Sequence, residues 1–259
     1  MPFQRFQPLA VKRIPAAFSH PDWVFEIKWD GFRALVYSDT DGACLVSRNG
    51  NTFKSFPGLC EGLRRDLKGR RCVLDGEIVC LNYDGKPQFR DLLFRRADPF
   101  FYAFDLLWDE HALSDDEEEM RRFRNGEDVR YLPLIDRKLR LRRVVPKLGE
   151  RLLYCDHVEV DGQGLFQLAC QHDLEGIVAK RKGDPYLPEH ATWLKIRNRN
   201  YSQWVGREEL FERERSSEPD FAAWSSCVLV CDDAQDVHAD GIQVDGCWPP
   251  LRKLVFPNC

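Results

Sequence analysis

Alternating apolar and polar positions dominate the first part of the chain. Residues 23–38 alternate on both sides of a turn at Asp30 and Gly31, and residues 43–47 continue the pattern. A period of two residues is typical of strands with one buried face. Residues 57–68 instead carry apolar side chains at helical spacing. The pattern therefore predicts strands joined as hairpins, followed by a helix.

The remaining pattern up to residue 200 predicts more strands than helices. We expect strands at 72–81, 99–108, 151–160, 175–181 and 192–198, and helices near 88–95, 139–145 and 164–172. Asp75 and Gly76 are expected to split the first of these strands. Residues 109–130 are a charged excursion, which indicates a solvated loop or surface helix. Many antiparallel-looking strands with few helices indicate an α+β fold.

The composition is that of an ordinary soluble protein. Of 259 residues, 43% are hydrophobic, and there is no run of about 18 apolar residues that could span a membrane. The first residues lack the continuous apolar stretch of a signal peptide, and the ten cysteines have scattered spacings. We expect a cytoplasmic protein with reduced thiols and no membrane partner.

Overall charge gives no support for a nucleic-acid partner, but its distribution allows one. The chain has 38 basic and 42 acidic residues, and ten of the acidic ones lie beyond residue 208. Basic clusters occur at 137–143, 180–182 and 195–199. Such clusters suit the phosphates of a duplex, although residues 137–143 fit a solvated helix at least as well.

A tetrapeptide, Lys28-Trp29-Asp30-Gly31, places a lysine at a strand end just before a tight turn. Alone it is weak, because an exposed hairpin lysine explains it equally well. It is followed in order by SRNG at 47–50, DGEIV at 75–79, FYAFDLL at 101–107, EGIVAK at 175–180 and WLKIR at 193–197.

This ordered set resembles motifs I, Ia, III, IIIa, IV and V of the covalent nucleotidyltransferase superfamily. In detail the chain is similar to ATP-dependent DNA ligases, especially the ligase module of bacterial end-joining ligases, and LPLIDRK at 132–138 fits that subgroup. The resemblance implies an ATP-grasp-like fold of antiparallel sheets flanked by helices. It also implies ATP and Mg²⁺ as cofactors and nicked duplex DNA as the partner.

Lys28 is the nucleophile that the resemblance implies, with Lys195 and Arg197 as catalytic partners. A lysine attacks the α-phosphorus of ATP only as the neutral amine, and with a free pKa near 10.4 roughly one lysine in a thousand is neutral near pH 7.4. Neighbouring cations and partial desolvation lower that pKa. The two cations would also offset charge on the α-phosphate. A solvated strand face is the alternative for Lys195 and Arg197.

The resemblance implies further contacts to the nucleotide. Glu26 and the Ile27 backbone would read the adenine edge, and Phe104 would stack on the base. A plain core position is a real rival explanation for Phe104, because aromatic residues surround it. The implied ribose and phosphate contacts are Arg33, Arg48 and Lys180, with Arg48 also near the 5′-phosphate of the nucleic acid.

Two carboxylates are candidates for binding a metal ion. Glu77 and Glu175 each lie beside a glycine in a predicted strand. Carboxylate oxygens suit a hard Mg²⁺ ion that bridges phosphates. The resemblance implies that Glu175 contacts the metal and that Glu77 contacts the metal or the ribose. A strand-edge carboxylate without a ligand is the alternative for each.

Residues 1–200 are expected to form the adenylation domain, and residues 201–259 a short divergent tail. Ligases of this kind continue after motif V into an OB-fold domain that carries motif VI, and five strands of about six residues do not fit comfortably in the tail. No motif VI is recognisable there. We therefore expect the tail to be degraded, divergent, or replaced by an end-joining or OB-fold partner protein.

Three functions follow. The first is an ATP-dependent DNA ligase that seals nicks through a lysyl-AMP intermediate in repair or recombination. The second is another covalent nucleotidyltransferase, such as an RNA ligase or a GTP-using capping enzyme. The third is a non-catalytic binding module that lacks turnover. The FDLLW and PLI-x-RK segments favour the first over the second, and the intact Lys28, Glu77, Glu175 and Lys195 argue against the third.

Overall fold

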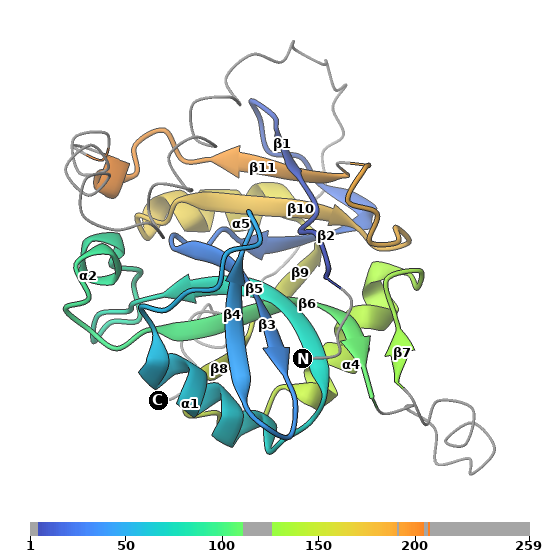
Figure 1. The fold of residues 1–259 in the computed structure, drawn as a ribbon. Coiled ribbons are helices and arrows are strands. Elements are labelled where there is room, and N and C mark those ends of the chain that lie inside the picture. Colours follow the sequence, from blue (N-terminus) through green and yellow to red (C-terminus); the bar gives the residue numbers. More distant parts are fainter. Residues whose placement is uncertain (1–4, 111–125, 191, 205–206, 208–259) are drawn as a thin grey trace.

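Two sheets form the body of the protein in a computed structural model, which describes residues 5–110, 126–190, 192–204 and 207 (Figure 1). The first sheet has the strand order β1 (Val11–Arg13), β11 (Trp193–Arg197), β10 (Gly176–Arg181), β2 (His20–Ile27) and β9 (His157–Val160). The second runs β4 (Ala43–Ser47), β3 (Phe32–Ser38), β5 (Cys72–Val79), β6 (Phe100–Asp109) and β7 (Glu127–Asp128), with β8 (Leu152–Tyr154) also paired to β6. We call them the nucleophile sheet and the β5 sheet, respectively.

Helices cover the outer faces of both sheets. They are α1 (Pro57–Leu67), α2 (Phe89–Leu93), α4 (Leu134–Val144) and α5 (Gly162–Gln171), and a 3₁₀ turn, η1, spans Ser202–Trp204. Leu59 and Leu63 of α1 belong to the core cluster that includes Leu74 of the β5 sheet. Leu165 of α5 packs with Ile177 of the nucleophile sheet. The predicted α+β class is confirmed.

The strand pairing is antiparallel with two exceptions among the described residues. β1 runs parallel to β11, and β8 runs parallel to β6. The strands β2, β3 and β4 and the helix α1 match the elements predicted from the first part of the chain, and β3 and β4 form an antiparallel hairpin. The expected hairpin of β2 and β3 was wrong, because the turn at Asp30 and Gly31 carries the chain from one sheet to the other. The strand β1 was not predicted, because three residues are too few to establish a period.

Two predictions about single strands were wrong. Residues 151–160 form two strands in different sheets: β8 pairs with β6, and β9 pairs with β2. The chain crosses between the sheets at Cys155, whose N–H donates to the Ala103 carbonyl at 2.8 Å. Conversely, Asp75 and Gly76 do not split a strand, because β5 continues through both residues. Its pairing with β6 shifts register between them.

The helix predicted at 139–145 begins earlier, at Leu134, with Pro133 as its N-cap. Most of the charged excursion at 109–130 lies outside the described residues, as does most of the tail at 201–259, but Glu127–Asp128 pairs with β6 as β7. The six cysteines in the described ranges are not in disulfide bonds. None of the helices described is long and apolar enough to cross a membrane, and the expected cytoplasmic location stays a prediction.

Candidate active site

Lys28 occupies the inner face of the nucleophile sheet, one residue beyond the end of β2. Its backbone N–H donates to the carbonyl of Gly176 at 2.9 Å, and Gly176 pairs with Arg197 on the next strand. Residues directly opposite each other on adjacent strands share a face. Lys28 and Arg197 therefore lie in one cross-strand row with Gly176 between them.

A second row runs beside the first. Glu26 of β2 pairs with Val178 of β10, which pairs with Lys195 of β11. Because positions two apart along a strand share a face, Glu26, Lys28 and the Lys195–Arg197 pair all project from the same side of the sheet. Motifs far apart in the sequence are thus brought together by the strand order β11-β10-β2.

Gly176 is required by this geometry. Its φ is +142°, and a Cβ there would lie 2.0 Å from the Ile196 carbonyl oxygen. Any other residue would push β10 away from β11 and disturb the row that holds Lys28 and Arg197.

The Lys28 side chain is bound to a carboxylate. Its Nζ lies 2.6 Å from Oε2 of Glu175, the residue just before β10. Lys28 is 23% exposed whereas Glu175 is 3% exposed, so the amine is reachable from solvent and its partner is not. Burial raises the pKa of Glu175, opposed by the charge of Lys28. The buried carboxylate is paired, as a stable fold requires.

Glu77 approaches from the facing β5 sheet. It is partly buried and lies in a cross-strand row with Arg33 and Tyr102. Burial raises its pKa to about 8, and the charges of Glu175 and Asp30 act in the same direction, against Lys28 and Arg33. Glu77, Glu175 and Lys28 therefore share one electrostatic environment between the two sheets.

Glu26 is part of a buried ionic triad. Its two carboxylate oxygens pair with Lys138 of α4 at 2.5 Å and with Lys180 of β10 at 2.6 Å. All three side chains are at most 2% exposed. Burial opposes ionisation of Glu26, but the two lysines outweigh it and lower its pKa. Its carboxylate is thus fixed by two cations from different elements.

Phe104 and Trp193 form an aromatic wall beside this triad. Lys180 Nζ lies 4.3 Å from the Phe104 ring centroid and 3.9 Å from that of Trp193. The two rings meet edge to face at 5.6 Å. Phe104 is partly buried, so the residue expected to stack on adenine packs here against a protein cation and a second ring.

Arg33 has its donors occupied inside the protein. It makes a bidentate pair with Asp75, at 3.1 and 2.7 Å, and donates to the Leu9 carbonyl at 2.6 Å. The Tyr186 hydroxyl also donates to Asp75, at 2.7 Å, and accepts from the Leu9 N–H at 2.8 Å. These contacts attach the N-terminal segment to the β5 sheet. Arg48, the other arginine expected to bind the nucleotide, is instead exposed on the turn after β4.

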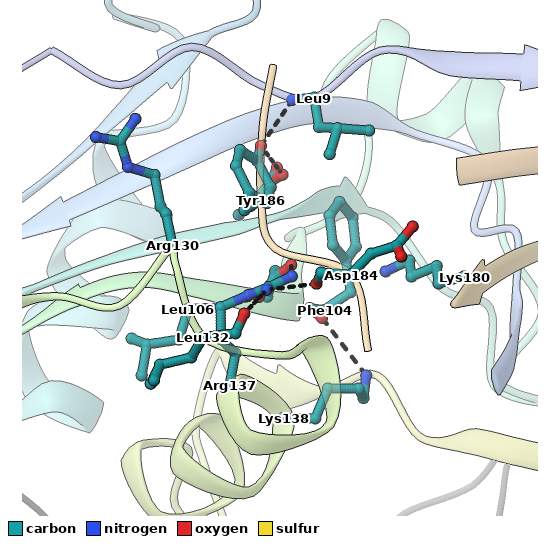
Figure 2. A network of polar contacts seen from close by, with 12 residues as sticks. Leu9, Phe104, Leu106, Arg130, Leu132, Arg137, Lys138, Lys180, Asp184 and Tyr186 are labelled. Carbon is teal, nitrogen blue, oxygen red and sulfur yellow. Dashed lines mark hydrogen bonds and ion pairs between the residues drawn. The ribbon is translucent and has the colours of Figure 1, made fainter. Parts of the chain in front are cut away.

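The basic cluster at 137–143 is not one solvated face, and that prediction was wrong for its first two residues. Arg137 is 1% exposed and holds Asp105 through two hydrogen bonds of 2.8 Å. Figure 2 shows it reaching from α4 to the loop after β10, where it donates to the Asp184 carbonyl at 3.0 Å. Lys138 belongs to the triad, while Arg142 and Arg143 are exposed.

Several residues of this network were not singled out from the sequence. The motif patterns contain Asp75 and Asp105, but each reads as a carboxylate beside a turn or in an apolar strand. Lys138 lies in the LPLIDRK segment, whose helical start was not recognised. Arg137 and Lys138 follow Leu134 at the three- and four-residue spacing of one helix face, and that spacing is the signal that could have indicated burial.

The carboxylates fit a magnesium ion in the way that this ion is usually held. No group of three or more His, Cys, Asp or Glu side chains in the described ranges could hold a metal by itself. Mg²⁺ commonly uses one or two carboxylates together with substrate phosphates. Glu77 and Glu175, which share one electrostatic environment with Lys28, are the two carboxylates here that could serve in this way.

The fold and site define the class of protein. The structure of a mycobacterial DNA ligase D complexed with ATP and MES is similar, with a TM-score of 0.60 and 29% identity over 74% of this chain and 60% of that one. A model of the "ATP dependent DNA ligase domain" matches residues 4–197. The chain belongs to this family, and it is an adenylation domain of an ATP-dependent DNA ligase, a covalent nucleotidyltransferase.

Curated relatives point to one branch of the family. The multifunctional non-homologous end joining DNA repair protein LigD of Mycobacterium tuberculosis is 32% identical over 202 residues, which is 76% of this chain and 24% of that protein. The bifunctional non-homologous end joining protein LigD of Bacillus subtilis is 30% identical over 211 residues, 68% of this chain and 31% of that protein. The chain thus spans about a quarter to a third of these relatives.

Proposed function

We propose that this domain seals nicks in duplex DNA in three steps that begin at Lys28. The Lys28 amine attacks the α-phosphorus of ATP, a P–N bond forms, the bond to the β-phosphate oxygen breaks, and pyrophosphate leaves. The AMP then passes to the 5′-phosphate of the nick and frees Lys28. Last, the 3′-hydroxyl attacks that 5′-phosphate, a phosphodiester forms and AMP is released.

The contact of Lys28 with Glu175 carries this proposal. Lys28 is 23% exposed, and its amine lies 2.6 Å from the carboxylate of Glu175, which is 3% exposed. Solvent can therefore reach this amine, which has Glu77 opposite and Arg197 in the same cross-strand row. Attack requires the neutral amine, so this hydrogen bond must break or its proton must pass to Glu175. Arg197 and Lys195 would then face the phosphates.

The metal and the base-binding residues complete the proposed site. Glu77 and Glu175 would hold Mg²⁺, which would neutralise charge on the phosphates. Glu26 and the Ile27 backbone would contact adenine, with Phe104 against the base and Lys180 near the phosphates. Arg48, which is exposed, would meet the 5′-phosphate of the nick. Arg33 pairs with Asp75, and this pair favours a structural role for Arg33 over direct contact with the ribose.

A role in DNA repair rests on the relatives. Both proteins described above are named for non-homologous end joining, and this chain is similar to a part of each. We propose nicked duplex DNA as the substrate and an end-joining or OB-fold protein as the partner. The boundary at residue 200 also stays a prediction, although Tyr201 and Arg207 contact the body.

Adduct formation tests the proposal. The protein is incubated with Mg²⁺ and α-labelled ATP or GTP and separated on a denaturing gel. We expect label from ATP alone, lost in Lys28→Ala and retained in Lys12→Ala, which changes an exposed lysine of β1. Sealing of nicked DNA, but not of nicked RNA, should follow. Label from GTP, or sealing of RNA only, would assign a different nucleotidyltransferase activity, and absence of an adduct would indicate a binding module.

A further inference from the structure

Asp30 lies in the tight turn that follows the nucleophile, and the residue is 2% exposed. One carboxylate oxygen accepts a hydrogen bond from the Tyr201 hydroxyl at 2.9 Å, and the other pairs with Arg207. Tyr201 and Arg207 are themselves buried. Both lie beyond residue 197, where the match to the ligase family ends.

The turn has other fixed points. The Lys28 N–H is bonded to the Gly176 carbonyl, and the Trp29 ring stacks on Tyr102 with 4.0 Å between centroids. Gly31 packs so closely on β5 that a Cβ would lie 2.0 Å from the Ile78 carbonyl oxygen. Each of these contacts comes from the sheets. The Asp30 side chain is instead held by Tyr201 and Arg207, which follow the WLKIR motif at 193–197 and lie outside the sheets.

We propose that Tyr201 and Arg207 are positioning residues for adenylylation, which act through Asp30 to hold the turn and aim the Lys28 amine. The proposal rests on the function of Lys28 proposed above. A buried carboxylate that loses its partners moves toward water, and the turn that carries it moves with it. Lys28 is two residues away, so its contact with Glu175 would be displaced. Misplacing a reacting group by about 1 Å can cost about a hundredfold in rate.

The same segment has contacts that do not involve Asp30, and they provide matched controls. The Ser202 hydroxyl donates to Asp173 at 2.5 Å, at the surface. Gln203 donates to the Pro87 carbonyl at 2.6 Å and accepts from the Phe89 N–H at 2.9 Å. Ser202→Ala therefore loosens the segment without removing a partner of Asp30.

The test measures the rate of Lys28 adenylylation at saturating ATP, and the KM for ATP, in the full chain. We expect Arg207→Met to lower the rate by about 10- to 100-fold and Tyr201→Phe by about 3- to 10-fold, with KM changed by less than about threefold. Arg207→Lys keeps the charge and should recover most of the rate. Ser202→Ala should stay within about twofold of the wild-type rate.

A double-mutant cycle distinguishes action through Asp30 from general damage. In an Asp30→Asn background, Arg207→Met should lower the rate by less than about a further twofold. Wild-type rates in Arg207→Met, additive losses in the cycle, or an equal loss in Ser202→Ala would each overturn the proposal. If a thermal melt shows that Arg207→Met fails to fold, the cycle with Asp30→Asn is repeated with Tyr201→Phe, which removes a single hydroxyl. The same criteria then apply to the Tyr201→Phe rates. Absence of a Lys28 adduct in the wild type would count against the proposed function instead.

Discussion

Lys28 and Glu175 are 147 residues apart in the sequence, and their side chains meet at 2.6 Å. Lys28 follows β2, Glu175 precedes β10, and these two strands are hydrogen-bonded neighbours. The antiparallel register therefore brings the end of one strand beside the start of the other. A nucleophile and the carboxylate that holds it arise from the pairing of two strands.

Replacing Glu175 by glutamine should lower the rate of lysyl-AMP formation by about a hundredfold. The amide has no charge to orient the Lys28 amine, and it is a poorer ligand for a hard cation. The rate is measured with labelled ATP and Mg²⁺. Glu159→Gln removes a surface carboxylate that pairs with Lys182, and it should leave the rate unchanged. Equal rates in the two variants would contradict the assigned role of Glu175.

Arg137→Met should reduce the free energy of unfolding by about 3–5 kcal/mol, because it leaves Asp105 as a buried charge without its partner. Urea denaturation measures the change. Arg143→Ala, an exposed position on the same helix, should change stability by no more than about 0.5 kcal/mol. If Arg137 were a surface residue that binds DNA, its replacement would weaken DNA binding and leave the urea midpoint in place.

Gly176→Ala should destabilise the protein by about 2–4 kcal/mol, because the new methyl group has a strained φ and meets the Ile196 carbonyl. Adenylylation should fall with it, since the same glycine spaces Lys28 from Arg197. Thermal melting and adduct yield are the two measurements. Gly183→Ala is the matched control, because a Cβ at Gly183 meets no atom within 4 Å. A normal melting temperature in Gly176→Ala would show that this strand pair tolerates a side chain.

His157 should make the fold sensitive to acid. Burial lowers its pKa from 6.5 to about 4. Between these values the unfolded chain binds a proton that the folded chain does not, so stability present above pH 6.5 is lost as the pH falls toward 4. Of the free energy of unfolding that is lost between pH 7 and pH 5, His157 accounts for at most about 2 kcal/mol.

His157→Gln removes the titrating group and tests that assignment. Unfolding free energies of both proteins are compared at pH 7 and pH 5. We expect the variant to lose less stability than the wild type on acidification. Parallel losses in the two proteins would mean that other groups, such as paired carboxylates, account for the acid sensitivity.

The sequence by itself determined the class of the protein and most of its elements. The period-two alternation of residues 23–47 predicted β2, β3 and β4, because one face of each strand must be apolar and the pattern repeats locally. The ordered motifs brought Lys28, Glu77 and Glu175 forward as candidates. Strand alternation and short motifs can be recognised in a sequence because each depends on residues only a few positions apart.

The tertiary structure alone decided which charges face the site and which are buried behind it. Sequence patterns read Arg137 and Lys138 as a basic surface, yet Asp105 and Glu26, from distant strands, neutralise them in the interior. Likewise, Tyr201 and Arg207 gain a role only because the chain folds back onto Asp30. Burial and ion pairing are set by neighbours in space, and no local pattern records which strand or helix will supply the opposite charge.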